Sequence, residues 1–174
     1  MDPSAPAPAH SRFDATEARL QATCRKHRSF PKPAATLVRL VKLLHRLTVD
    51  HGNELLRAHG LGYPEYNVLM MIDASPDGAL SPSLIAEAAG EKFANVTRLT
   101  NQLVDKGLLA RAASAQDRRM SLLQLTPAGH ALIAAFLPQV SRELRQYTRH
   151  LDSGEQAQLQ ALMLKLLRGV EESL

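Results

Sequence analysis

The sequence lacks most of what a disulfide framework, a membrane anchor or an aromatic catalytic cleft requires. Its 174 residues include one cysteine, Cys24, and no tryptophan, and aromatic residues make up 4%. A single cysteine excludes an intramolecular disulfide and fits a reducing compartment. No apolar run is long enough to span a bilayer, and no basic start with a short apolar core marks a signal peptide. We therefore expect a cytoplasmic protein that does not bind membranes.

Motifs for catalysis and metal binding are also missing from the sequence. There is no nucleophile elbow, phosphate-binding loop or dinucleotide-binding motif. His45, His51 and His59 are spaced six and eight residues apart, whereas helical zinc sites pair their ligands one turn apart. We therefore expect no enzymatic activity, no metal and no other cofactor.

Positive charge is a feature that the sequence does have, and it is unevenly distributed. The net charge is +4 and the pI is about 9.5. Residues 90–120 carry six Lys or Arg against three Asp or Glu, and residues 24–59 carry eight against two. Clustered basic charge is typical of a phosphate-binding surface. For residues 24–59 a solubilising helix face explains the charge equally well, so both interpretations stay open there.

Residues 80–129 carry the most informative pattern in the chain. Ser81 before Pro82 predicts a helix start, because a serine oxygen caps backbone N–H groups and proline fits the first helical position. Gly90 predicts the end of this helix, since glycine tolerates positive φ. Between them, apolar residues recur at helical spacing, namely Leu84, Ile85 and Ala88.

A second helix is predicted from about Phe93 to Lys106. Its inward residues are Val96, Leu99, Leu103 and Val104. Its open face carries Lys92, Asn95, Thr97, Arg98, Asn101 and Gln102. Asparagine and arginine suit bidentate contacts to adenine and guanine, and threonine suits a phosphate or a thymine methyl. Alone, this pattern also fits an amphipathic helix with a solvated face, but the hairpin that follows favours DNA recognition.

Two strands joined by a basic loop follow the second helix. The strands are predicted at residues 108–112 and 120–125, and the loop contains Asp117, Arg118 and Arg119. An arginine at a hairpin tip suits the narrow minor groove of A·T-rich DNA, and the aspartate can orient Arg119. Helix, turn, helix and hairpin in this order predict a winged helix-turn-helix. The expected fold class is mainly α with a small β-hairpin (α+β).

Four motifs in this segment resemble those of the multiple antibiotic resistance regulator (MarR) family. They are Thr97-Arg98, Lys106-Gly107, Asp117-Arg118-Arg119 and Leu125-Thr126-Pro127-Ala128-Gly129. The resemblance covers roughly residues 34–174, and the leading helix is similar to the branch containing EmrR-type repressors of multidrug efflux. It implies a bacterial, nucleoid-associated transcriptional regulator whose partner is a double-stranded DNA operator.

The motifs and the open helix face together give the predicted DNA-binding residues. These are Ser81, Lys92, Asn95, Thr97, Arg98, Asn101, Asp117, Arg118 and Arg119. Lys92 departs from the family pattern, since many members place Ser or Thr there. Because lysine cannot cap a helix through a side-chain oxygen, we expect Lys92 to contact a phosphate instead.

Long amphipathic segments on either side of the winged domain predict a homodimer. A helical pattern over residues 33–59 would span roughly 40 Å, too long for one small core to cover. Ser153 is expected to cap a last helix whose apolar stripe reaches Leu174. A partner chain is the simplest cover for both, and a two-fold dimer would place two recognition helices about 34 Å apart.

A further helix is predicted between the hairpin and this last helix. Thr126 and Pro127 mark its start, and Pro138 is expected to bend it or interrupt its hydrogen bonding. The expected organisation has four parts. They are a disordered tail (residues 1–12), N-terminal dimerisation helices (13–61), the winged domain (62–129) and C-terminal dimerisation helices (130–174).

The resemblance also implies a pocket for small aromatic or phenolic ligands near the dimer helices. The predicted lining comes from the long first helix and from the helix before the reader: His45, Val49, His51, Tyr63, Tyr66, Met70 and Met71. Methionines suit an adaptable apolar wall, and Tyr or His can hold a carboxylate or hydroxyl. Each of these residues is also consistent with an ordinary place in the core.

The sequence therefore predicts a ligand-responsive repressor that binds a pseudo-palindromic operator as a homodimer. Two alternatives stay open. Cys24 has basic neighbours that can activate a thiolate, which would make the protein a redox-responsive regulator, although a lone cysteine is more often incidental. A non-specific architectural DNA-binding protein would share the basic helix and wing, with little sequence preference and a steep salt dependence.

Overall fold

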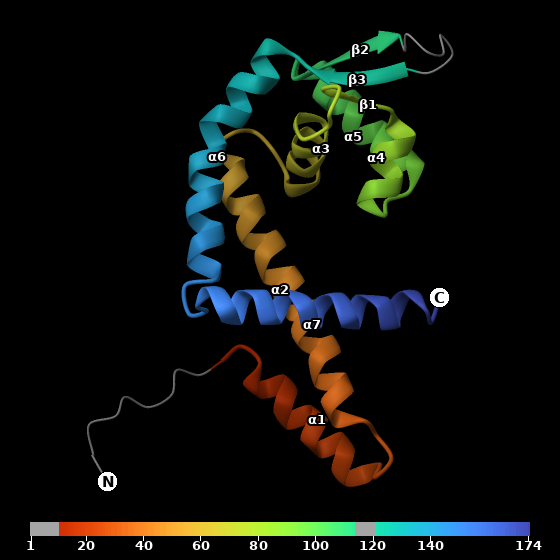
Figure 1. Cartoon of the computed structure of the whole chain (residues 1–174), viewed down its shortest axis with the longest axis vertical. Coiled ribbons are helices and arrows are strands. Elements are labelled where there is room, and N and C mark those ends of the chain that lie inside the picture. Colours follow the sequence, from red (N-terminus) through yellow and green to blue (C-terminus); the bar gives the residue numbers. More distant parts are fainter. Residues whose placement is uncertain (1–10, 114–120) are drawn as a thin grey trace, which may run out of the picture. The chain divides into compact units, whose positions relative to one another are not determined.

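The computed structural model describes residues 11–113 and 121–174, which form seven helices and a three-stranded sheet (Figure 1). In chain order the elements are α1 (Asp14–Lys26), α2 (Lys32–Arg57), α3 (Tyr63–Asp73), β1 (Ala79–Leu80), α4 (Pro82–Ala89), α5 (Phe93–Asp105), β2 (Leu109–Ala113), β3 (Ser121–Leu125), α6 (Pro127–Tyr147) and α7 (Ser153–Glu171). The predicted fold class, mainly helical with a small antiparallel hairpin, is confirmed.

The chain divides into two compact units, residues 1–54 and 55–174. The first unit contains α1 and most of α2. Phe13 and Leu20 are buried in it, and Lys32 Nζ lies 3.7 Å from Glu17 Oε1 at the surface. Most of the predicted disordered tail, residues 1–10, lies outside the described residues.

The second unit has an apolar core beneath its sheet. Fully buried side chains from α3, α4, α5, β2, β3 and α6 meet there: Leu69, Ile72, Ile85, Val96, Leu103, Leu109, Leu123 and Phe136. Figure 1 shows the strands at one end of this unit with α5 beside them and α6 running away from the sheet. The core therefore fixes α5 against the hairpin that follows it.

The sheet has strand order β1-β3-β2 and is antiparallel throughout. In the hairpin, Leu109 pairs with Leu125 and Ala113 with Ser121, within one residue of the predicted strands. On the other side, Leu80 of β1 pairs with Leu123. β1 was not predicted from the sequence, because a strand of two residues has no alternation to detect.

Helix starts follow local capping rules in three places. The hydroxyl of Ser81 accepts from Leu84 N at 3.3 Å, and that of Thr126 accepts from Gly129 N at 3.0 Å, as predicted. The prediction that Ser153 caps α7 is wrong. Asp152 is the cap, because its carboxylate accepts from Glu155 N at 2.8 Å while the Glu155 carboxylate accepts from Asp152 N at 2.9 Å.

Two further observations concern the helices. Pro138, where a bend or interruption was expected, lies inside α6, which continues as one helix from Pro127 to Tyr147.

None of the helices within residues 11–113 and 121–174 is long and apolar enough to cross a membrane.

Candidate nucleic-acid interface

The predicted recognition helix, α5, is held in place by its buried face. Val96 and Leu103 are fully buried and Leu99 is 8% exposed, as the spacing predicted. Thr100 is also fully buried, and its hydroxyl donates to Thr97 O at 3.1 Å. This back-bond satisfies the hydroxyl inside the helix, so a polar residue can lie in the core.

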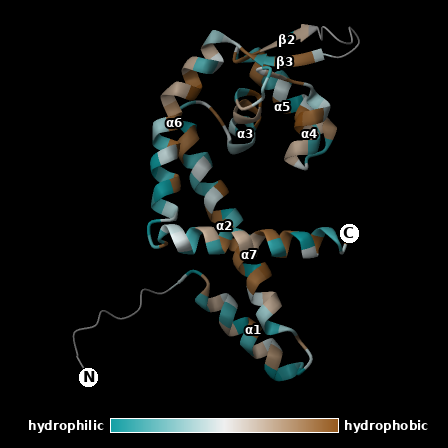
Figure 2. Ribbon diagram, viewed as in Figure 1, coloured by the Kyte–Doolittle hydropathy of each residue, from teal (hydrophilic) through white to brown (hydrophobic). Residues whose placement is uncertain are grey.

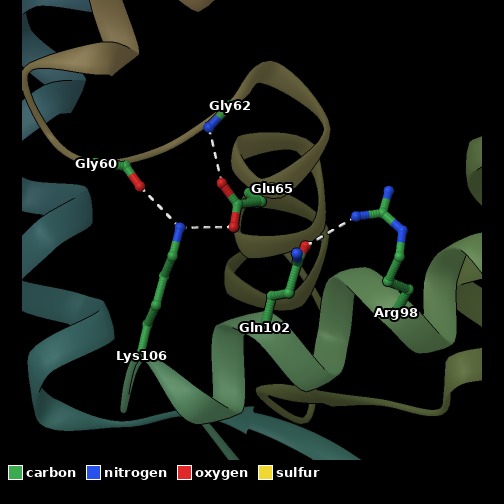
Figure 3. A network of polar contacts seen from close by, with 6 residues as sticks. All are labelled: Gly60, Gly62, Glu65, Arg98, Gln102 and Lys106. Carbon is green, nitrogen blue, oxygen red and sulfur yellow. Dashed lines mark hydrogen bonds and ion pairs between the residues drawn. The ribbon is translucent and has the colours of Figure 1, made fainter.

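The C-terminal end of α5 is tied to the start of α3 by Lys106 (Figure 3). The Lys106 ammonium donates to Gly60 O at 2.8 Å and to Glu65 Oε1 at 2.7 Å. Glu65 is 9% exposed, and its second oxygen accepts from Gly62 N at 2.8 Å. A nearly buried carboxylate thus caps α3 and pairs with the cation at the end of α5, which fixes the direction of the recognition helix.

The Lys106-Gly107 and Leu125–Gly129 motifs meet at the base of the hairpin. The Thr126 hydroxyl donates to Gly107 O at 2.7 Å and caps α6 at the same time. Gly107 has φ +70°, a backbone conformation that favours glycine. A Cβ on Gly129 would overlap the Leu108 carbonyl oxygen and lie 3.0 Å from a Leu125 methyl. The two motifs therefore form one structural unit that anchors the hairpin to α5 and α6.

The opposite side of α5 is open to solvent and mostly polar, with Phe93 at its start as a large exposed hydrophobic residue. Lys92, Asn95, Arg98, Asn101 and Gln102 are exposed, and Thr97 is half-buried. Arg98 Nη1 donates to Gln102 Oε1 at 3.1 Å, one helical turn away (Figure 3). The Thr97 hydroxyl donates to Phe93 O at 2.9 Å.

The acidic residue Glu91, which was not among the predicted contacts, lies just before α5. Its carboxylate accepts from Asn95 Nδ2 at 3.1 Å. Lys92 is the N-cap residue and makes no side-chain capping bond, as its side chain requires. An ammonium only donates hydrogen bonds, so it cannot satisfy the free backbone N–H groups at this end of α5. The helix dipole favours an anion here.

Arg111 on β2 was missed as a candidate because it lies inside a predicted strand. Its Nη2 donates to Asn101 Oδ1 at 2.6 Å, so a cation from the hairpin is held against the exposed face of α5. Alternation along β2, with Leu109 buried and Ala110 and Arg111 exposed, was too irregular to reveal this orientation.

Ser81 differs from the other predicted DNA contacts. It is 4% exposed, and its hydroxyl oxygen accepts from Leu84 N. The hydroxyl oxygen of Ser81 therefore serves as a helix cap, and its predicted contact with DNA stays a prediction. Asp117, Arg118 and Arg119 of the predicted wing lie outside the described residues, which stop at Ala113 and resume at Ser121.

The predicted effector residues fall into two groups. On α2, in the first unit, His45 and His51 are exposed and Val49 is half-buried. On α3, Tyr63, Tyr66, Met70 and Met71 are half-buried and pack against the core of the second unit.

Aromatic rings surround Tyr66 in the second unit. Its ring lies 5.6 Å from that of Tyr63 and 5.5 Å from that of Phe136, centroid to centroid. Burial, with a smaller contribution from Tyr63, raises the pKa of Tyr66 above its ordinary value of 10.0. The phenol therefore stays neutral near pH 7 and can donate a hydrogen bond.

Cys24 on α1 is half-buried, with Sγ 4.0 Å from Phe30 O. Within the part of the chain that the structure describes, no group of three or more His, Cys, Asp or Glu side chains could hold a metal ion.

Comparison with known proteins identifies the family. The sequence profile of the MarR family matches residues 59–120. The regulator MhqR of Bacillus subtilis (strain 168) is 30% identical over 125 residues, which cover 70% of this chain and 81% of MhqR. The chain belongs to the MarR family. This MarR-family transcriptional regulator is also 28% identical over 162 residues to the transcriptional repressor MprA of Escherichia coli (strain K12), covering 93% and 92% of the two chains.

The fold is also similar to that of a solved structure. A cysteine-to-serine mutant of MarR from E. coli, complexed with operator DNA, matches with a TM-score of 0.68 and 26% identity. The match covers 75% of this MarR-family regulator and 93% of the E. coli chain.

Proposed function

We propose that this MarR-family regulator is a repressor that binds a pseudo-palindromic operator as a homodimer and is released by a small aromatic or phenolic effector. The observation that carries the proposal is the division of α5 into two faces. One face is locked into the core through Val96 and Leu103, and the other exposes amide and guanidinium groups to solvent. The complex of the E. coli MarR mutant with operator DNA supports the same use of the fold.

Base contacts are assigned to the middle of α5. A guanidinium has five N–H donors, and Arg98 uses one on Gln102, which leaves the others for a guanine edge. Asn95 suits adenine. To contact the base, its amide has to break its hydrogen bond to the Glu91 carboxylate. Thr97 is proposed to contact a thymine methyl or a phosphate.

Phosphate contacts are assigned to the cations that border this face. Lys92 lies at the positive end of the α5 dipole, and Arg111 on β2 is held against α5 by its hydrogen bond to Asn101. The wing residues complete the proposed contacts from the sequence alone: Arg118 and Arg119 engage the minor groove and an adjacent phosphate, and Asp117 orients Arg119. Neutralised phosphates supply affinity and register, whereas the α5 contacts supply sequence preference.

Dimerisation is supported by exposed apolar side chains in both units. On α2 these are Leu37, Val38, Val41 and Leu44, each at least 40% exposed. α7 has no buried residue, and Figure 2 shows hydrophobic residues along its length. Its large exposed hydrophobic residues are Leu159, Leu162, Met163, Leu164, Leu167 and Val170. Contiguous apolar surface of this kind is typical of a subunit interface.

An effector is proposed to act by changing the separation of the two recognition helices. Tyr63 and Tyr66 offer aromatic faces and phenol donors on α3, and Met70 and Met71 offer an adaptable apolar surface. A ligand that prefers a dimer with the wrong separation shifts the population away from DNA by its differential affinity for the two states.

Selection from a random duplex library with the full chain tests this proposal. We expect enrichment of an inverted repeat with half-sites one helical turn apart, about 10 bp from centre to centre. Recovery of unenriched DNA would identify a non-specific architectural protein instead. The redox-responsive alternative makes a different prediction. Peroxide, and not phenolic acids, would release the selected duplex from the protein, and the Cys24→Ser variant would no longer respond to peroxide.

A further inference from the structure

A cavity of about 590 Å³ lies between α1 and α2 in the first unit. It is lined by Thr16, Arg19, Leu20, Thr23, Phe30, Arg39, Lys42, Leu43 and Arg46. Its volume is within the range of small-molecule sites. None of the seven predicted effector residues lines it, so it is separate from the effector surface assigned above.

The cavity is built from one matching stripe on each helix. α1 contributes Thr16, Arg19, Leu20 and Thr23, and α2 contributes Arg39, Lys42, Leu43 and Arg46. Both sets follow the spacing i, i+3, i+4, i+7, which places four residues on one helix face. Phe30 joins them from the connection between the helices.

The charge of the lining has one sign. Arg19, Arg39, Lys42 and Arg46 are all cationic, and the lining contains no Asp or Glu. Within residues 11–113 and 121–174, none of the four makes an ion pair within 4.0 Å; nearby Glu17 pairs with Lys32 instead. Four cations facing one cavity without a carboxylate repel one another, and an anion relieves that repulsion.

Part of the lining is apolar. Leu20 is 7% exposed, and Leu43 and Phe30 are half-buried. Guanidinium groups bind carboxylate, sulfonate and phosphate in bidentate fashion, and apolar side chains can contact the hydrocarbon part of a ligand. The Thr16 hydroxyl can supply a further polar contact, whereas the Thr23 hydroxyl donates to Arg19 O at 3.0 Å.

We propose that this cavity is a binding site for a small organic anion with an apolar body. A phosphodiester backbone needs a continuous basic surface and gains nothing from the apolar side chains of Leu20, Leu43 and Phe30. The site also gives three of the cations in the basic segment 24–59 a specific use, in place of a solubilising face.

Calorimetric titration of the full chain at low salt tests the site with three probes. The probes are 2-naphthoate, its neutral counterpart 2-naphthalenemethanol, and inorganic phosphate. We expect saturable binding of one naphthoate per protomer, with the alcohol and phosphate each about tenfold weaker or more, because each lacks half of the recognised chemistry. Arg39→Gln combined with Arg46→Gln should weaken naphthoate binding about tenfold or more.

A matched control removes the same charge elsewhere in the unit. Arg25→Gln combined with Arg28→Gln changes two exposed cations that do not line the cavity, and naphthoate affinity should stay within about twofold. Since Arg39 and Arg46 are exposed, their variant should keep the wild-type circular dichroism. Lys42→Gln provides a second, single-site variant with a smaller loss in the same direction.

An internal reporter gives an independent readout. Since the chain has no tryptophan, Phe30→Trp places a single indole in the cavity, and Phe93→Trp places one on exposed α5. Octanoate is used as the ligand because it does not absorb light at the wavelengths that excite indole. It should change the fluorescence of Phe30→Trp and leave that of Phe93→Trp unchanged. The proposal is overturned if wild type binds no naphthoate, if the alcohol binds equally well, or if both double variants lose affinity alike. It is also overturned if the Arg39 and Arg46 changes only dissociate the dimer or only weaken DNA binding.

Discussion

Lys106 and Glu65, 41 residues apart in sequence, are joined by a 2.7 Å ion pair that links the recognition helix to α3. The pair is asymmetric, since the Lys106 side chain is 41% exposed and that of Glu65 only 12%. The carboxylate therefore depends on the lysine and on Gly62 N for compensation of its burial. The orientation of α5 is consequently coupled to the stability of the second unit.

Removal of this cation should destabilise the fold. Lys106→Met leaves the Glu65 carboxylate without its cation, and we expect the free energy of unfolding to fall by about 1–2 kcal/mol, reduced by the partial exposure of Lys106. Urea denaturation measures this change. Lys165→Met, on the exposed surface of α7, is the control and should be close to neutral.

Gly129 gives a prediction about the anchor of the hairpin. Gly129→Ala places a Cβ against the Leu108 carbonyl, and we expect a loss of about 1–3 kcal/mol in the free energy of unfolding. Gly169→Ala is matched to it, because Gly169 lies inside α7 with open space around it. That change should stabilise by up to about 1 kcal/mol. Equal effects of the two substitutions would refute the close approach at Gly129.

The raised pKa of Tyr66 predicts a loss of stability in alkali. Well below pH 10 the phenol is protonated in both the folded and the unfolded chain, so its ionisation does not affect the free energy of unfolding. As the pH rises above 10, the unfolded chain ionises first, and the free energy of unfolding should fall until the folded pKa is passed. Tyr66→Phe should make that fall smaller in urea titrations at pH 8 and about pH 11. An unchanged fall would show that Tyr66 is not desolvated.

Arg111 is expected to contact phosphate rather than bases. Arg111→Gln should weaken binding to the selected operator and to random duplex by similar factors, and reduce the salt slope of log K by about 1. Anisotropy titrations at several salt concentrations measure both quantities. Arg145→Gln on α6 carries the same charge change and should alter neither. A loss confined to the operator would instead assign Arg111 a role in holding Asn101 for base recognition.

Local signals were sufficient to predict the helices, the starts of α4 and α6, and the polar residues on the exposed face of α5. Ser81-Pro82 and Thr126-Pro127 follow capping rules that involve only neighbouring residues, and both predictions are confirmed. The cap of α7 was misassigned because Ser153 and Asp152 are both good caps. Only the pairing of Asp152 with Glu155 three residues later separates them.

Features that depend on long-range contacts could not be predicted in this way. The strand β1 exists because Leu80 pairs with Leu123, and the contact between Arg111 and Asn101 requires the hairpin to fold back on α5. The Lys106-Gly107 motif was recognised without its cause, which lies in Glu65 and Thr126. The predicted roles of the effector residues and of the wing arginines stay predictions.

The most direct test of sequence recognition by α5 is the affinity of Arg98→Ala for the selected operator and for random duplex, each compared with wild type. We expect a loss of about 1–3 kcal/mol on the operator and a much smaller loss on random DNA, because a bidentate base contact exists only in the specific complex. Arg142→Ala, an exposed arginine on α6, should change neither affinity. Equal losses on both duplexes would reduce Arg98 to a phosphate anchor and contradict the assignment of base reading to this face.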